Sequence, residues 1–168
     1  MNVQWPTVEV VARCLDETLA LGRRIGQHAL SGQCLALEGI MGTGKTQLVR
    51  GISYGAQVAD PGLVNSPSFV LLNVYPASPG NPHSKTVYHL DAYRVKNSDE
   101  FMAAGLPELL EQEGIVCIEW ARRIADLLPE DYVLVQGTSL DESSRCWRLT
   151  AHGPISGALL SAITQTGL

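Results

Sequence analysis

The sequence predicts an α/β three-layer sandwich with a mixed, largely parallel central sheet, and three observations lead to that class. Short apolar runs of strand length recur along the chain, and stretches with helical periodicity or helix caps separate them. Near the C-terminus two such runs follow each other around a polar turn, which adds an antiparallel pair to the sheet. The 168 residues suffice for one domain with a sizeable core, and we expect a single domain over residues 1–168.

The first part of the chain predicts a helix, a strand, a turn and a second helix. Residues 7–30 carry apolar side chains at helical spacing, so we expect a helical N-terminal region there. The apolar run Gln33–Glu38 predicts a strand, and Gly39–Gly44 predicts a glycine-rich turn. From Lys45 to about Tyr54 the apolar residues share one face, which predicts a helix. Residues 55–67 contain two prolines and favour a loop.

Strand-like and polar segments alternate in the middle of the chain. Residues 68–75 (SFVLLNVY) and 86–93 (TVYHLDAY) predict two strands, because β-branched and aromatic side chains are frequent in them. The connection over residues 76–85 holds three prolines, so we expect a polar excursion there. Ser98 has the preference of a helix N-cap, and we expect a helix over the segment SDEFMAAG that it opens.

The last third predicts one more buried strand and a hairpin. Residues 114–120 (GIVCIEW) form an apolar run of strand length, and a short helix around Ala121–Leu128 follows. Residues 131–137 (DYVLVQG) and 145–153 (RCWRLTAHG) predict the final pair of strands around a turn at Asp141–Ser144. A short helix from Pro154 would end the chain.

Composition and charge narrow the classes of function. The net charge of −5 gives a surface that repels a phosphate backbone on average, which argues against a stand-alone nucleic-acid binder. The four cysteines include no C-x-x-C pair, so we expect buried, reduced thiols rather than a zinc site. No apolar run approaches the ~20 residues that cross a bilayer, and no leader sequence opens the chain. We therefore expect a cytoplasmic protein that does not insert into a membrane.

Residues Gly39–Thr46 read GIMGTGKT and match G-x-x-x-x-G-K-[ST], the P-loop pattern. A strand is predicted before them and a helix after them, as the pattern requires. Glycines allow the backbone amides to turn inward around an anion, and the N-terminus of the helix adds a positive dipole end. Lys45 supplies a charge for the β- and γ-phosphates, and the Thr46 hydroxyl supplies one ligand to Mg²⁺. The sequence therefore predicts a nucleoside triphosphate site in a P-loop NTPase fold.

Two carboxylates qualify as the metal-side or catalytic group. Asp91 ends the strand-like run TVYHLD, and Glu119 ends IVCIE. Ligands of open α/β sheets bind at the carboxyl ends of strands, so both side chains are expected beside the phosphate loop. Either one could activate water or hold the metal.

A serine pair and a histidine are weaker candidates. Pro67 keeps Ser66 out of helical geometry, and Ser66 and Ser68 end the loop after the predicted P-loop helix, where switch segments place a hydroxyl near the γ-phosphate. Taken alone, however, Ser-Pro-Ser is an ordinary turn. His89 shares strand parity with Asp91, and its role stays open.

The motifs GIMGTGKTQLVRGI, NSPSFVLLNVY, YHLDAYR and IEWARR occur in this order, and together they resemble the TsaE family, also called YjeE. H-x-D-x-Y-R and I-E-W are far more specific than the phosphate loop, and the resemblance covers residues 18–123. The family usually has S-P-T where this chain has Ser66-Pro67-Ser68. Serine keeps the hydroxyl and lacks one methyl group.

The resemblance implies a slow, cytoplasmic ATPase with the cofactors ATP and Mg²⁺. It implies that the chain supports the threonylcarbamoyl modification of tRNA adenosine (t6A) by acting on homologues of TsaD and TsaB, and that it meets tRNA only through that complex. Asp91 would be a metal-side carboxylate, and Glu119 would belong to the hydrolytic site beside Trp120. Tyr93 and Arg94 would support the site or contact a partner.

The candidate site residues fall into three overlapping sets. The catalytic set is Lys45, Asp91 and Glu119. The metal set is Thr46, Asp91 and Glu119. The nucleotide-binding set is Gly39, Met41, Gly42, Thr43, Gly44, Lys45, Thr46, Gln47, Ser66, Ser68 and Trp120.

Three alternatives remain open. A small-molecule or nucleotide kinase would share the phosphate loop and would use Arg122 and Arg123 in place of lid arginines. A GTPase is disfavoured, because no N-K-x-D segment reads guanine and no D-x-x-G follows a strand. A nucleotide-gated binding module, whose hydrolysis is incidental, would assemble with its partners on ATP binding alone.

Overall fold

The computed structural model describes residues 5–67, 71–103, 105, 108, 110 and 113–165. Within that part of the chain one sheet has the strand order β1-β7-β6-β2-β5-β4-β3. Its strands are β1 (Thr7–Ala12), β2 (Gln33–Glu38), β3 (Leu72–Tyr75), β4 (Val87–Asp91), β5 (Ile115–Glu119), β6 (Tyr132–Ser139) and β7 (Arg145–Ala151). The central strands β6, β2, β5 and β4 are parallel, whereas β7, β1 and β3 add antiparallel edges.

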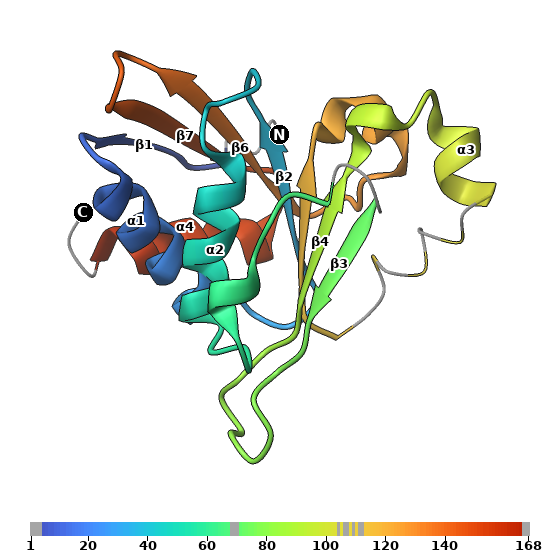
Figure 1. Cartoon of the computed structure of the whole chain (residues 1–168), viewed down its shortest axis with the longest axis horizontal. Helices are drawn as coiled ribbons and strands as arrows, with labels where there is room; N and C mark the ends of the chain where they lie inside the picture. The colour runs from blue at the N-terminus through green and yellow to red at the C-terminus, as the bar shows by residue number, and fades with distance from the viewer. Residues whose placement is uncertain are drawn as a thin grey trace.

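Helices cover both faces of the sheet (Figure 1). The α-helices are α1 (Leu15–His28), α2 (Lys45–Gly55), α3 (Ser98–Ala103) and α4 (Pro154–Gln165). Short 3₁₀ helices lie at η1 (Pro61–Leu63), η2 (Ala92–Arg94) and η4 (Ala121–Leu127). Figure 1 shows α1, α2 and α4 on one side and α3 on the other. The three-layer α/β sandwich with a mixed, largely parallel sheet is therefore confirmed.

The core divides at the sheet, because successive strand residues point to opposite faces. On β2, Leu35 and Leu37 join the cluster that α1, α2 and α4 cover, whereas Cys34 and Ala36 join the cluster beneath α3 and η4. All six residues of β2 are buried, as expected for a central parallel strand covered on both faces. The rigid centre of the sheet therefore carries the phosphate loop.

The N-terminal prediction was wrong for its first part. Residues 7–30 are not one helical region, because Thr7–Ala12 form β1 and α1 begins only at Leu15. The segment TVEVVA is rich in β-branched residues, and it pairs with β7 through Val8–Leu149 and Val10–Trp147. The spacing of its apolar residues fits a strand with one buried face as well as it fits a helix. Pairing with the distant strand β7 selects the strand.

The other elements follow the predictions closely. The strand Gln33–Glu38, the helix from Lys45, the helix from Ser98 and the β6–β7 hairpin are confirmed. Residues 86–93 form a shorter strand, Val87–Asp91, and the short helix after it is η2. The helix around Ala121–Leu128 is a 3₁₀ helix with a kink at Ile124. Of the strand predicted over residues 68–75, Leu72–Tyr75 is confirmed, and residues 68–70 lie outside the described part.

Helices α1 and α2 pack through glycines. A Cβ added at Gly26 would stand 2.0 Å from the Ile52 carbonyl oxygen, and one added at Gly55 would stand 1.9 Å from that of Arg23. Such distances leave no room for a side chain, so the two backbones are in direct contact. The helix that follows the phosphate loop is thereby fixed against α1.

The parallel register brings three strand ends together toward the top of Figure 1. Glu119 of β5 pairs with Leu37 of β2 on one side and with Asp91 of β4 on the other. The loop after β2 therefore lies beside both carboxylates, which is the crevice where open α/β sheets bind ligands. Among the described residues, no helix is both long and apolar enough to span a membrane.

Candidate functional site

The segment between β2 and α2 has the backbone of an anion-binding loop. Gly42 and Gly44 have φ values of 81° and 102°, in the left-handed region that favours glycine. Gly44 is the N-cap of α2, so the first amides of that helix face the loop. The Thr43 side chain turns back to donate a hydrogen bond of 2.6 Å to the Ile40 carbonyl, which closes the loop on itself. Such a concave run of amides suits a phosphate group.

The hairpin β6–β7 supports this loop from behind. A Cβ at Gly39 would stand 2.8 Å from the Gly137 carbonyl oxygen, so only glycine fits there. Arg145 Nε donates a 3.0 Å hydrogen bond to the Thr43 carbonyl. No local pattern points to Arg145, because this residue follows Thr43 by 102 positions and reaches the loop only through the order of strands in the sheet. Gly39 and Thr43 thus shape the loop.

Lys45 lies buried at the start of α2. Its Nζ donates to the carbonyl oxygens of Gly39 at 2.7 Å and Ile40 at 3.2 Å, and it stands 4.5 Å from the centre of the Trp120 ring. Burial lowers the pKa of Lys45 below its ordinary value, and the nearby carboxylates of Glu119, Asp91 and Glu38 oppose that shift. The ammonium group is therefore held inside the loop by two carbonyl oxygens, the face of an indole ring and the negative charge of nearby carboxylates.

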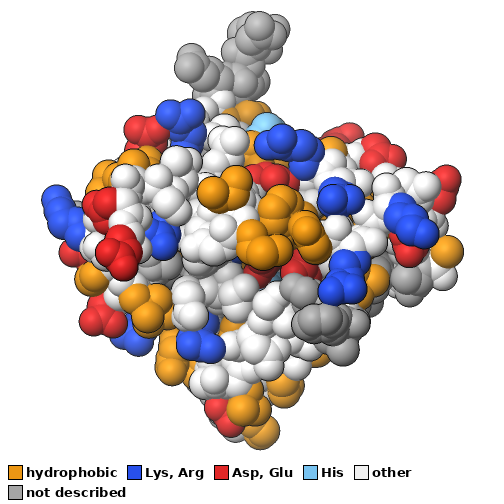
Figure 2. All heavy atoms as spheres, turned by 45° about the horizontal axis from the view of Figure 1, so that its top comes forward, with side chains coloured by type: hydrophobic (Ala, Val, Ile, Leu, Met, Phe, Trp, Pro, Cys, Tyr) orange, Lys and Arg blue, Asp and Glu red, His pale blue; other side chains and the backbone are white. Residues whose placement is uncertain are grey.

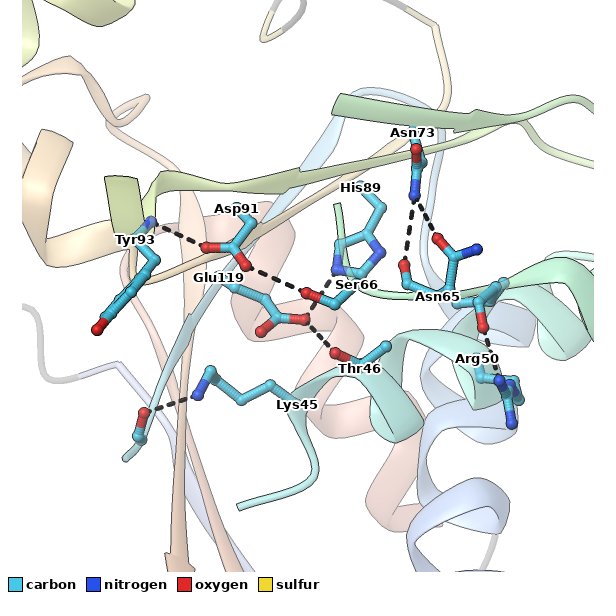
Figure 3. A network of polar contacts seen from close by, with 12 residues as sticks. Lys45, Thr46, Arg50, Asn65, Ser66, Asn73, His89, Asp91, Tyr93 and Glu119 are labelled. Atoms are coloured by element: carbon cyan, nitrogen blue, oxygen red, sulfur yellow. Dashed lines mark hydrogen bonds and ion pairs between the residues drawn. The ribbon is translucent and has the colours of Figure 1, made fainter. Parts of the chain in front are cut away.

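Glu119 connects the loop helix to β4 (Figure 3). Its Oε1 accepts a 2.7 Å hydrogen bond from the Thr46 hydroxyl and lies 2.9 Å from His89 Nε2. His89 is fully buried and Glu119 is 4% exposed. Nε2 of His89 and Oε1 of Glu119 therefore lie within hydrogen-bond distance of each other inside the protein. His89, whose role the sequence left open, thus lies within the site, and its shared parity with Asp91 was the signal.

Asp91 forms a second polar group beside the first. Its Oδ2 accepts a 3.3 Å hydrogen bond from Ser66, and its Oδ1 accepts one of 2.8 Å from the Tyr93 amide. The backbone bond turns the chain into η2 directly after the strand. Figure 3 shows Asp91, Ser66, Glu119 and Thr46 converging above Lys45. Ser68, the other predicted serine, lies outside the described residues.

Trp120 has an uncommon backbone for a bulky residue, with φ of 59° and ψ of 35°. Its amide donates a 3.0 Å hydrogen bond to the Leu37 carbonyl, which fixes the turn between β5 and η4. The Trp120 ring packs against Tyr93, with ring centres 5.1 Å apart. The strained turn thereby places an aromatic wall over the ammonium group of Lys45.

These groups enclose a cleft of about 420 Å³. Its lining residues are Met41, Gly42, Gly44, Lys45, Thr46, Gln47, Ser66, Asp91, Tyr93, Glu119 and Trp120. Nearly all of the predicted site residues in the described part are therefore brought together, and Tyr93 joins them as a wall. Ile40 and Met41 on the loop are 71% and 70% exposed. Figure 2 shows apolar side chains gathered in the middle of the face that the top of Figure 1 presents, with Lys and Arg side chains around them.

A second cleft of about 310 Å³ adjoins the other side of the phosphate loop. It shares Gly42, Gly44 and Gln47 with the first cleft. Its remaining lining comes from the start of α1, from Thr43 and from the β6–β7 turn: Cys14, Leu15, Thr18, Thr43, Glu142, Ser143 and Arg145. The two clefts therefore adjoin each other at the phosphate loop.

The donor set suits a phosphate chain with a hard divalent cation. Lys45 and the loop amides provide positive charge, and Thr46, Ser66 and the two carboxylates provide oxygen atoms, the ligands that Mg²⁺ prefers. Over the described residues, no three or more His, Cys, Asp or Glu side chains group so as to hold a metal. A cation here would therefore need phosphate and water oxygens besides protein ligands.

The comparison with protein families decides the relationship. The family model "Threonylcarbamoyl adenosine biosynthesis protein TsaE" matches residues 12–147. The chain belongs to the TsaE family. The matched span runs from the end of β1 into β7, so it includes the phosphate loop, Asp91 and Glu119. The resemblance seen in the sequence motifs is confirmed.

Curated TsaE proteins of several bacteria are similar over most of their length. The protein of Treponema pallidum is 32% identical over 80% of this chain and 94% of its own, and that of Bacillus subtilis is 30% identical over 90% and 87%. The Nostoc protein is 35% identical over 80% of each chain. All three are described as tRNA threonylcarbamoyladenosine biosynthesis protein TsaE.

A solved structure has the same fold. The crystal structure of YdiB from Bacillus subtilis superposes with a TM-score of 0.74, at 22% identity, over 99% of this chain and 100% of that one. At this level of identity the likeness shows the fold, and it extends over nearly the whole of this chain.

Proposed function

We propose that this chain binds ATP with Mg²⁺, hydrolyses it slowly, and serves threonylcarbamoyladenosine biosynthesis as the ATPase of a tRNA-modification complex. The observation that supports the proposal most directly is the 2.7 Å hydrogen bond between Thr46 and Glu119. It joins the hydroxyl of a P-loop to a buried carboxylate at the end of the neighbouring strand. That pair is the protein side of a Mg²⁺–nucleotide site in P-loop hydrolases.

The residues of the cleft would divide the work of binding. The loop amides and Lys45 would grip the β- and γ-phosphates, and Lys45 would exchange a carbonyl partner for phosphate oxygen. Thr46 would turn its hydroxyl from Glu119 to the metal ion, with Glu119 staying close as its negative counterpart. Thr46 and Glu119 would hold a Mg²⁺ ion, which would supply positive charge against the charge that develops on the phosphates.

Hydrolysis needs a group that orients a water molecule toward the γ-phosphorus, on the side opposite the bond that leads to the β-phosphate. Asp91 and Ser66 lie together beside Glu119, and the Asp91 carboxylate would accept a hydrogen bond from that water. Glu119 contacts Thr46 of the phosphate loop, whereas Asp91 contacts Ser66. We therefore assign Glu119 to the metal side and Asp91, with Ser66, to the water side.

The second cleft would hold the nucleoside. It adjoins the loop at Gly42 and Gly44, on the side away from Asp91 and Glu119. A phosphate chain lying over the loop with its γ-phosphate at the carboxylates would direct the ribose and base toward Cys14 and Arg145. Both ends of the nucleotide would then contact the chain.

The chain would act on homologues of TsaD and TsaB and would not modify tRNA itself. Its net charge of −5 suits a subunit that leaves most tRNA contact to partners. The family's role in threonylcarbamoyladenosine biosynthesis is the second support.

The experiment that tests the proposal combines calorimetry with phosphate release. ATP with Mg²⁺ should bind the isolated chain with 1:1 stoichiometry, and phosphate release should be slow alone and faster with TsaD and TsaB homologues. Absence of ATP binding both alone and with these partners would contradict the proposal. Transfer of the γ-phosphate to an added metabolite, rather than to water, would favour the alternative of a kinase.

The arginines that such a kinase would use for a lid already have local partners. Arg123 donates to the Val95 carbonyl at 3.2 Å, and Arg122 lies 3.9 Å from Glu38. These contacts favour water as the acceptor. If the chain is a binding module whose hydrolysis is incidental, ATP binding alone should be enough for assembly with its partners. A variant that binds ATP but does not hydrolyse it would then still support the partners' activity, whereas an energy-coupled cycle would require hydrolysis.

A further inference from the structure

We propose that Arg50, Asn73 and Tyr75 are positioning residues that fix Ser66 against Asp91 from outside the cleft. The inference rests on the proposed function, since it names the residues that hold one segment of the proposed ATPase site in place. The segment concerned is the loop over residues 60–67, called here the Ser66 loop. Two independent sets of hydrogen bonds anchor it, one from α2 and one from β3 (Figure 3).

The first anchor comes from the helix that begins at the phosphate loop. Arg50 Nη2 donates a 2.7 Å hydrogen bond to the carbonyl oxygen of Val64, a fully buried residue of the Ser66 loop. Arg50 lies one turn after Thr46 on α2. The helix whose first turn would hold the nucleotide therefore also holds the Ser66 loop.

The second anchor comes from β3 and grips Asn65. The Tyr75 hydroxyl accepts from the Asn65 amide and donates to the Asn65 carbonyl, both at 3.2 Å. Asn73 Nδ2 donates to the Asn65 side chain at 2.8 Å and to the Tyr75 hydroxyl at 3.2 Å. Both backbone groups of Asn65 are thus bound by side chains of one short strand.

Ser66 follows Asn65 directly, so these anchors decide where its hydroxyl stands. Ser66 is exposed, and Pro67 after it restricts its backbone. The hydroxyl reaches Asp91 at 3.3 Å only because the residue before it is fixed. Asn73 also pairs with His89 across β3 and β4, and His89 contacts Glu119. The three positioning residues are thus connected to both carboxylates of the site. Ser66 lies between them and Asp91, and His89, the strand partner of Asn73, lies between them and Glu119.

The position of Arg50 is unfavourable for solvation of its guanidinium group, which a purely structural contact would not require. Its Nε is buried without a hydrogen-bond partner, and within the described ranges no carboxylate forms an ion pair with it. A guanidinium group in that state loses hydration without full compensation. Unfavourable desolvation of this kind is typical of functional sites. Here it accompanies the contact between α2, the helix of the nucleotide site, and the Ser66 loop.

The experiment uses the whole chain with Tyr75→Phe, Arg50→Met and Arg50→Lys. Tyr75→Phe removes only the hydroxyl, and Arg50→Lys keeps a donor that can reach the Val64 carbonyl. Tyr54→Phe is the matched control, because Tyr54 lies 39% exposed on α2 and its ring packs against Arg23 of α1. Amide hydrogen exchange of residues 60–67 is measured without nucleotide, and ATP turnover is measured over a range of ATP concentrations.

We expect exchange in the Ser66 loop to rise by about fivefold in Tyr75→Phe and Arg50→Met, as for loss of one hydrogen bond. We expect kcat to fall by about fivefold or more, with the KM for ATP changed by less than about twofold. Arg50→Lys should restore most of both quantities, and Tyr54→Phe should match the wild type. Unchanged exchange and kcat in both variants would overturn the inference, as would a loss confined to KM.

Failure of the proposed function is distinguishable from failure of this inference. Wild-type protein that turns over no ATP, alone or with its partners, refutes the function. The exchange measurement on the same samples still decides whether Arg50 and Tyr75 hold the Ser66 loop.

Discussion

Thr46 Oγ1 lies 2.7 Å from Glu119 Oε1, and this contact joins the first turn of the loop helix to the end of the neighbouring parallel strand. The same carboxylate oxygen also contacts His89. These two contacts on one oxygen, from Thr46 and His89, fix the orientation of the carboxylate and leave Oε2 for other ligands. The site is thus arranged before any ligand arrives, and its parts can be tested one by one.

Glu119→Gln should separate ATP binding from ATP turnover. The amide keeps the shape of the side chain and loses the charge that would face Mg²⁺, so phosphate release should fall by about a hundredfold or more. ATP affinity should change far less, because Lys45 and the loop amides stay in place. Phosphate release and calorimetry measure the two quantities. Glu130→Gln, a change at an exposed glutamate, is the control, and equal turnover in both variants would refute the role of Glu119.

Lys45→Ala should weaken ATP binding itself. Removal of the ammonium group leaves the loop amides as the main donors to the phosphates, so we expect affinity to fall by about tenfold or more. Titration of nucleotide with Mg²⁺ measures the loss. Lys96→Ala changes the net charge equally at an exposed position and should bind as the wild type does. Similar affinities for the wild type and Lys45→Ala would show that the loop does not grip the phosphates.

Gly26→Ala should destabilise the fold by about 1–3 kcal/mol through overpacking. The new methyl group would stand 2.0 Å from the Ile52 carbonyl oxygen, so α1 and α2 would have to separate. Urea unfolding measures the change in free energy. Gly157→Ala in α4 is the matched control, since its nearest neighbour would be 3.6 Å away and alanine favours a helix. A Gly26→Ala protein as stable as the wild type would contradict the direct contact of the two backbones.

Asp131 should stabilise the start of α4 in a pH-dependent way. Its carboxylate accepts hydrogen bonds from the Ile155 and Ser156 amides at 2.7 and 2.9 Å. Partial burial opposes ionisation, but the hydrogen bonds from Ser156 and Ile155 outweigh it and hold the pKa of Asp131 below its ordinary value. Because the pKa is lower in the folded state, the stabilisation is complete above the ordinary pKa and is lost as the pH falls through the folded value.

Asp131→Ala should therefore cost about 1 kcal/mol at neutral pH, as for a lost helix cap. Its difference from the wild type should shrink as the pH approaches about 3. Chemical unfolding at several pH values checks this, with Asp60→Ala as an exposed aspartate control. A difference that stays constant down to acid pH would argue against ionised Asp131 as the cap.

The parts of the site that depend on local sequence could be predicted. A glycine pattern between a strand and a helix defines the loop around Lys45, and strand ends define the places of Asp91 and Glu119. The strand at Thr7–Ala12 was missed, because its apolar spacing fits two periods and only pairing with β7 selects one.

Contacts between distant segments could not be predicted from one sequence. Arg145 reaches the Thr43 carbonyl only because β7 lies two strands from β2, and Arg50 has no motif that connects it to Val64. The contact of His89 with Glu119 likewise depends on the register of two strands. Sheet order, rather than any local pattern, determined these partners.

The turn at Trp120 gives the molecule a built-in optical reporter. The indole lies against the ammonium group of Lys45, a charge that quenches or shifts indole emission according to its distance from the ring. Any ligand that draws this ammonium group away changes the field at the chromophore. Arrival of a phosphate chain can thus be followed in real time by the light that the unlabelled protein emits.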